Sequence, residues 1–172
     1  MKVLTKSLSA AIILIAFTLS AHAQASETAT ATATIVTPIN IANATDMNFG
    51  NIAVIATGGT VILTPAGTRS ITGDVTLPAV TGTVTAATFD VTGQANFTYS
   101  ITLPASPAED VTITNGTDNM TVSTFTSTPS GIGTLDGTGA QTLSVGATLN
   151  VVGGESSGVY TGGPFTVTVN YN

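Results

Sequence analysis

Cysteine and tryptophan are absent from the sequence, and basic residues are scarce. The 172 residues include three lysines or arginines and one histidine, against nine acidic residues. Without cysteine the chain can form no disulfide, so a core, a bound ion or assembly must hold its fold. So few cations also cannot supply the phosphate contacts on which binding to nucleic acids and to anionic membrane surfaces depends.

The N-terminus has the pattern of a secretory signal peptide. Lys2 and Lys6 precede an apolar run over residues 8–19, and an Ala-x-Ala cleavage site ends at Ala23. The run is shorter than the roughly 20 apolar residues that span a membrane, so we predict cleavage after Ala23 rather than a transmembrane anchor. We therefore expect a periplasmic, surface or extracellular protein that has no membrane span after cleavage.

Cleavage would leave 149 residues with a single cation, Arg69, and with no histidine. Catalytic Ser-His and Cys-His pairs and histidine-based zinc sites are then excluded. Glu109 and Asp110 are adjacent, but they fall in an expected loop, where neighbouring carboxylates are usually solvated. We expect a protein that is not an enzyme, with no catalytic residue and no cofactor.

Acidic secreted β-domains often bind calcium, but this sequence lacks the pattern of a calcium loop. Asp118 and Asp136 stand alone, without the Asp-x-Asp-x-Asp-Gly spacing of a calcium loop. Aspartates at turns commonly accept hydrogen bonds from their own backbone. We therefore predict no metal site.

The residues that are abundant predict an all-β fold. Threonine and valine favour strands, and glycine and proline mark turns. Residues 97–103 alternate between apolar and polar side chains, and the Asn115-Gly116 pair is a strong hairpin signal. Several short strands at this spacing predict an antiparallel β-sandwich.

Both ends of this expected domain carry strand patterns. The last residues alternate, with an apolar face made of Phe165, Val167, Val169 and Tyr171. A second alternating stretch lies near the N-terminus, and its shared face consists of Ala29, Ala31, Ala33, Ile35, Ile39 and Ile41. Its first half offers only methyl groups, so burial would stabilise it weakly, by about 0.8 kcal/mol for each group of that size. It is therefore typical of a detachable strand.

We divide the chain accordingly into the signal peptide over residues 1–23, an N-terminal extension over residues 24–45 and a sandwich domain over residues 46–172. At the start of this domain the apolar parity switches at Gly50, which indicates a bulge or kink.

The C-terminal pattern, with its penultimate Tyr171 and an upstream Gly158, resembles the C-terminal motif of chaperone–usher pilins. Asn48-Phe49-Gly50-Asn51-Ile52 is similar to the segment that opens the domain in their spore-coat-protein-U-like branch. The chain also resembles an uncharacterised family of small secreted bacterial β-domains. Pilins of these families usually carry a disulfide near the start of the domain, and this chain departs from that pattern.

The pilin resemblance implies an immunoglobulin-like sandwich that lacks one strand. Residues of about 27–41 in one copy would then fill the groove of the next copy by β-augmentation. The strand from Phe165 to Tyr171 would form one wall of that groove and would first pair with a periplasmic chaperone. The implied partners are other copies of the chain, that chaperone and an outer-membrane usher. Whether the N-terminal strand pairs in cis or in trans stays open.

Two alternatives to a pilin-like subunit remain, a binding module and an inert structural protein. The binding module would be a monomeric extracellular protein that binds glycans or ice. Against glycans, Phe97, Tyr99, Phe165 and Tyr171 occupy core-type positions rather than an exposed platform. Threonine ladders could bind ice, but threonine is also the commonest residue on the wet face of a strand. An inert structural protein of the cell envelope is the third possibility, and the sequence does not separate it from a pilin-like subunit.

Overall fold

The computed structural model describes residues 24–172, and the expected signal peptide lies outside them. The chain divides into two units between Ile35 and Val36. In the first unit, residues 24–35 are exposed and have no regular secondary structure. The second unit, Val36–Asn172, contains the strands described below.

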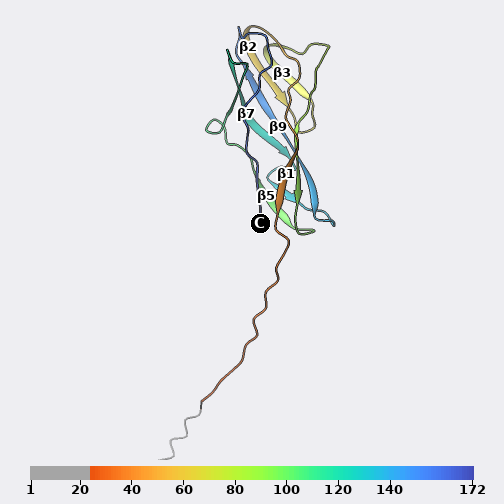
Figure 1. Cartoon of the computed structure of the whole chain (residues 1–172), viewed down its shortest axis with the longest axis vertical. Helices are drawn as coiled ribbons and strands as arrows, with labels where there is room; N and C mark the ends of the chain where they lie inside the picture. Colours follow the sequence, from red (N-terminus) through yellow and green to blue (C-terminus); the bar gives the residue numbers. More distant parts are fainter. Residues whose placement is uncertain (1–23) are drawn as a thin grey trace, which may run out of the picture. The chain divides into compact units, whose positions relative to one another are not determined.

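The second unit is built from antiparallel strands (Figure 1). These are β1 (Asn40–Thr45), β2 (Ala53–Leu63), β3 (Arg69–Thr76), β4 (Ala87–Thr92), β5 (Thr98–Thr102), β6 (Val111–Thr114), β7 (Asn119–Thr128), β8 (Ile132–Thr134), β9 (Ala140–Val151) and β10 (Thr168–Tyr171). Residues 24–172 contain no helix that is long and apolar enough to cross a membrane. The all-β, antiparallel prediction is confirmed, and the arrangement is consistent with a β-sandwich.

Strand β9 is the centre of the larger, seven-stranded sheet. One edge of β9 pairs first with β4, over Ala140–Val145, and then with β2, over Ala147–Val151. Its other edge pairs with β7, and β7 in turn pairs with β6. Strand β1 extends this sheet beyond β4, and β3 extends it beyond β2.

Gly146 lies at the point where β9 changes partner from β4 to β2. A Cβ atom at this position would overlap the carbonyl oxygen of Leu63, the last residue of β2. The change of partner therefore requires a residue without a side chain, because the backbone of β2 approaches β9 too closely for one.

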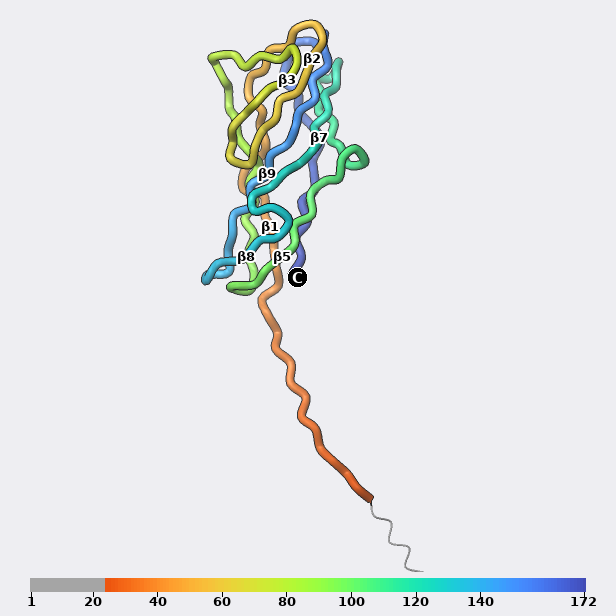
Figure 2. Tube along the Cα trace, turned by 180° about the vertical axis from the view of Figure 1, so that it is seen from behind, coloured from red at the N-terminus to blue at the C-terminus, as the bar shows by residue number. Residues whose placement is uncertain are grey.

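The smaller sheet has the order β10-β5-β8. It lies at the end of the domain where the chain terminates, while β2 and β3 lie at the opposite end (Figure 2). Tyr99 of β5 and Val169 of β10 join one hydrophobic core with Leu143 and Leu149 of β9. Both sheets thus bury their apolar faces against the same core, which is the requirement that makes two layers stable.

The N-terminal strand is shorter than the sequence predicts. Residues 24–39 form no strand, and β1 begins at Asn40, directly after Pro38 and Ile39. Strand β1 pairs with β4, with Ile41 opposite Val91. Part of the predicted extension over residues 24–45 therefore belongs to the folded unit. The isoleucines give it an apolar face to bury, and the alanines that precede it offer very little.

We predict that Gly146→Ala destabilises the domain by about 1–3 kcal/mol, the usual cost of forcing extra volume into a packed site. Gly137→Ala is the matched control, because a Cβ atom there has no neighbour within 4 Å. The control should be neutral or slightly stabilising. Urea denaturation of both variants measures the difference, and equal midpoints would contradict the role assigned to Gly146.

Candidate functional site

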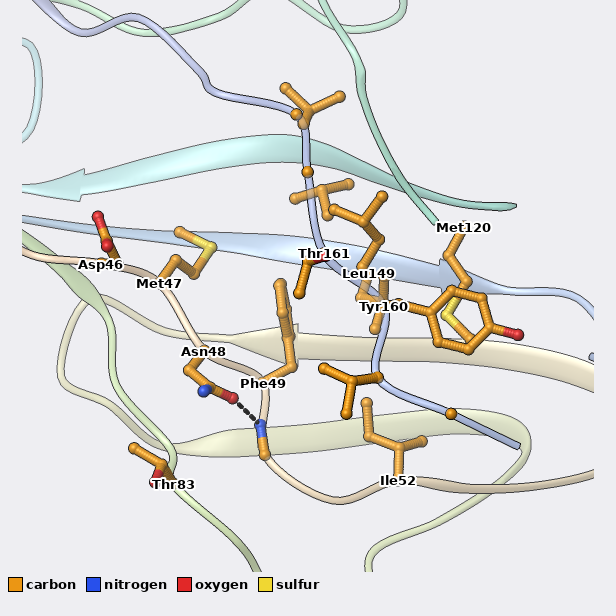
Figure 3. Close-up of a pocket in the computed structure, with 18 of the residues that line it drawn as sticks. Asp46, Met47, Asn48, Phe49, Ile52, Thr83, Met120, Leu149, Tyr160 and Thr161 are labelled. Carbon is orange, nitrogen blue, oxygen red and sulfur yellow. Dashed lines mark hydrogen bonds between the residues drawn. The ribbon is translucent and has the colours of Figure 1, made fainter. Parts of the chain in front are cut away.

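An open groove of about 1100 Å³ lies beside the C-terminal part of the chain. Two segments face each other across it, residues 46–54, here called the first wall, and residues 155–165, the second wall. Figure 3 shows Met47, Phe49 and Ile52 on the first wall and Tyr160 and Thr161 on the facing segment. The groove therefore separates two stretches of chain that are far apart in the sequence.

The floor of the groove is apolar. It is formed by side chains of β4, β6, β7 and β9, namely Ala87, Phe89, Val111, Ile113, Met120, Val122 and Leu149. Several of these side chains are only partly buried, including those of Ile113 and Met120. The larger sheet thus leaves part of its inner face without a complete covering layer at this place.

The first wall is attached to the domain along one edge. The backbone of Asn48 exchanges two hydrogen bonds with Thr85, of 2.8 and 3.0 Å, and Asn51 N donates to Thr81 O at 2.7 Å. The Asn48 side chain also accepts a 2.8 Å bond from Gly50 N. Gly50 has φ of +71°, a conformation that glycine adopts readily and other residues rarely do. The parity switch predicted at Gly50 is thus a real change in backbone direction.

The second wall is held at its beginning by polar contacts. Ser156 N donates to Asp118 Oδ2 at 2.7 Å, and the Tyr160 hydroxyl donates to Ser156 O at 2.8 Å. Hydrogen bonds from Ser156, first from its side chain and then from its backbone, lower the pKa of Asp118. Burial and the nearby charges of Asp118 and Glu155 raise the pKa of Tyr160.

The end of the second wall has no neighbouring strand. Thr161 forms an isolated bridge with Thr114, but residues 162–167 pair with no strand in the described part of the chain. Pairing resumes only at Thr168, where β10 lies against β5. The backbone of this stretch, in which Pro164 has no N–H, therefore forms no strand ladder within the described residues.

The C-terminal residues with alternating apolar side chains lie against the core, and only the last of them are in a strand. Val167 and Val169 are buried, and Phe165 and Tyr171 are partly buried. The ring of Phe165 packs on Phe125 with a centroid distance of 4.8 Å and also lines the groove. Of these four residues, Phe165 is the one that lines the groove itself.

Tyr171 connects three distant segments of the domain. Its hydroxyl donates to Thr37 O at 2.7 Å and accepts a 2.6 Å hydrogen bond from Gln94 N. Thr37 N donates in turn to Gln94 Oε1 at 3.2 Å. A Cβ atom on Gly93 would overlap this hydroxyl, so glycine is needed at that turn. Tyr171 thus fixes the beginning of the folded unit to its last strand.

The residues predicted to form the N-terminal strand fall into two groups. Ala29, Ala31, Ala33 and Ile35 lie in the exposed stretch of the first unit, and the side chain of Ile35 is 98% exposed. Ile39 and Ile41, in contrast, are partly buried and pack against the core of the second unit. The six residues therefore do not act as one continuous strand in a single copy of the chain.

Asp136 caps a turn with its own neighbouring residues. Asp136 Oδ1 accepts hydrogen bonds from Thr138 Oγ1, Thr138 N and Ala140 N at 2.6, 2.7 and 3.0 Å. These bonds, with that from the Thr138 hydroxyl first, lower the pKa of Asp136. Residues 24–172 contain no group of three or more His, Cys, Asp or Glu side chains that could hold a metal ion.

Of the candidate residues at the C-terminus, Phe165 belongs to the second wall, and the sequence pattern did not predict that residues 46–54 would line a groove. The signal was present, because Phe49 and Ile52 are apolar on either side of a glycine at which the parity switches. The apolar pattern does not indicate which segment lies beside the first wall. Its edge pairs with residues 81–85, which form no named strand of their own.

We predict that Tyr171→Phe lowers the free energy of unfolding by about 1–3 kcal/mol, because two partners lose a hydrogen bond in a partly buried site. Amide exchange at Gln94 should also accelerate. Urea denaturation and hydrogen exchange measure these effects. Tyr160→Phe, which loses one bond to Ser156 O, serves as the control and should leave exchange at Gln94 unchanged. If amide exchange at Gln94 is unaltered in Tyr171→Phe, the hydroxyl of Tyr171 does not hold this turn.

The lowered pKa of Asp118 predicts a loss of stability in acid. A carboxyl whose pKa is lower in the folded state stabilises that state fully above its unfolded pKa of about 3.9, and the contribution disappears as the pH falls through the folded pKa. In Asp118→Asn, the free energy of unfolding should therefore fall less steeply below about pH 4. Denaturation curves from pH 2 to pH 6 test this, and identical slopes for both proteins would contradict it.

Comparison with known proteins places the chain in a family without assigning it an activity. No curated protein and no solved structure gives a significant match. The family model described as "Domain of unknown function (DUF4402)" matches residues 39–171. This range begins one residue before β1 and ends with the last residue of β10, so it covers nearly the whole folded unit. The chain belongs to the DUF4402 family.

Proposed function

We propose that this protein is a secreted, non-enzymatic structural or adhesive subunit of the bacterial surface. It assembles head to tail by strand complementation, in the manner of a pilin. Its domain is an immunoglobulin-like sandwich with one strand missing, and the groove is the place of that strand. The partner is a second copy of the chain, which contributes residues 24–35.

The groove has the properties that a complementing strand requires. Its floor is apolar, with Ile113, Met120 and Leu149 available to cover. Residues 162–167 of the adjoining backbone are unpaired within the described chain, so an added strand could form main-chain hydrogen bonds along one edge. Main-chain bonds then supply affinity, and alternate side chains entering the groove supply specificity. This combination of apolar floor and unpaired edge is the observation on which the proposal rests.

Residues 24–35 have the properties of the strand that would enter. Every residue in this stretch is exposed and none is in regular secondary structure. Glu27 is its one charged residue, and its apolar residues alternate up to Ile35. Extended chain reaches about 3.3–3.6 Å per residue, so the stretch spans about 40 Å. The six unpaired residues 162–167 span about 20 Å at strand spacing, which the stretch can cover with residues to spare.

Head-to-tail complementation also determines the kind of assembly. Each copy offers a strand at one place and a groove at another, so the contact is heterologous and produces open filaments rather than closed dimers. A periplasmic chaperone that covers the groove before assembly, and an outer-membrane usher that orders the subunits, are the partners that such a route needs.

The glycan-binding alternative receives less support from the structure. A sugar platform needs exposed aromatic rings, and Phe97 is the one phenylalanine or tyrosine of residues 24–172 that is more than a third exposed, at 41%. Its ring packs against the ring of Tyr171 in an edge arrangement, with 5.6 Å between the centroids. The contact with Tyr171 leaves less of the Phe97 ring free to stack on a sugar.

Deletion of residues 24–35 from the full chain should abolish oligomers and leave a soluble, folded β-domain. Size exclusion with light scattering and negative-stain microscopy of the secreted protein measure this. A point variant is sharper, since Ala31→Asp places a charge on the face expected to enter the groove and should prevent assembly. Thr32→Asp places the same charge on the opposite face and should be tolerated.

Three outcomes would overturn the proposal. Unchanged oligomers after the deletion would show that the stretch is not the connecting strand. Equal effects of Ala31→Asp and Thr32→Asp would contradict insertion with one face buried. A full chain that stays monomeric at all concentrations, and that loses stability on deletion, would show that the groove takes the stretch of the same molecule.

A further inference from the structure

Arg69 is the only lysine or arginine among residues 24–172. It is the first residue of β3 and pairs with Leu63 of β2 in the larger sheet. Its Nη1 donates to two backbone carbonyl oxygens of the first wall, Phe49 O at 2.6 Å and Asn51 O at 3.0 Å. The one cation of the described chain thus binds backbone at the groove.

The geometry of the first wall brings both carbonyl groups to this guanidinium. Gly50, which separates them, has φ of +71°, and its amide is bound to the Asn48 side chain. A Cβ atom at Gly50 would overlap Thr81 O and would lie 3.0 Å from Arg69 Nη1. The close approach of the guanidinium therefore depends on the absence of a side chain at this position.

The two bonds attach the first wall to the larger sheet. The bonded residue Phe49 and the next residue after Asn51, Ile52, line the groove. The other backbone bonds of residues 48–51 lead to Thr81 and Thr85, residues that belong to no named strand. Arg69 thus ties the middle of the first wall to the start of β3, while the end of the wall, Ala53 and Val54, pairs with the other end of β3. A guanidinium carries five N–H donors in a rigid fork, so one side chain can bind both carbonyl groups.

We infer that Arg69 is a positioning residue that holds the first wall in place and keeps the groove able to accept a strand. The inference rests on the proposed function for the identity of the strand. Without Arg69, the carbonyl groups of Phe49 and Asn51 lose their donor, and residues 49–52 become free to move over the apolar floor. The groove would then be partly closed before any strand arrives.

Arg69→Met and Arg69→Lys in the full chain test this. The methionine side chain is of similar length but has no hydrogen-bond donors. The lysine keeps the positive charge, but its ammonium group is a point charge and lacks the planar arrangement of donors of a guanidinium. Thr72→Val is the matched control on the same strand, since it removes the 2.7 Å hydroxyl contact with Thr60 and leaves the first wall untouched. Two readouts are taken, self-association by analytical ultracentrifugation and amide hydrogen exchange of residues 48–52 in dilute protein.

Arg69→Met should raise the concentration for half-maximal association at least tenfold and accelerate exchange at residues 48–52. Arg69→Lys should give an association concentration and an exchange rate between those of Arg69→Met and the parent chain. The Thr72→Val control should match the parent chain in both measurements. Unchanged exchange in Arg69→Met overturns the inference, whatever the association shows. A parent chain that does not associate refutes the proposed function alone, because exchange at residues 48–52 still decides the role of Arg69. If Arg69→Met fails to fold, the same two readouts on Arg69→Lys decide it.

Discussion

Covering the apolar inner face of the larger sheet is the constraint on which the rest of this structure depends. Around Leu143 and Val145 the smaller sheet completes the core. Further along β9 and β7, near Leu149 and Met120, the covering layer consists of two separated walls with a groove between them. A sheet is stable when its apolar face is buried against another layer, and at the groove this burial is incomplete.

Polar contacts hold both walls of the groove. Asp118 fixes the start of the second wall through Ser156, and Arg69 and Asn48 fix the first wall around Gly50. Charged residues are rare in this chain, at 7% of the sequence. Asp118 and Arg69 are each bonded to a wall of the groove, and neither wall has a continuous strand on both edges to hold it.

Period-two alternation made most of the fold predictable. The strands around Tyr99 and Val169 were found because their buried and exposed residues alternate strictly, and Asn115-Gly116 marked the hairpin between β6 and β7. Alternation describes which face of a segment is apolar, but not which segment pairs with it. It therefore predicted a strand through Ala29 and Ala33, where the structure has none. It also gave no indication that β10 would pair only from Thr168 onward, or that Arg69 would reach the backbone of Phe49.

The hydroxyl of Tyr171 has a mechanical consequence. Thr37, close to the beginning of the folded unit, is bonded directly to the penultimate residue of the chain and, through Gln94, to the turn that follows β4. Tension applied to the chain ahead of Val36 therefore reaches β10 and this turn together, before it can unzip β1 from β4. A load shared between two attachments is harder to break than one carried by successive single bonds. The end of the folded unit that adjoins the N-terminal stretch is thus held by more than its first strand.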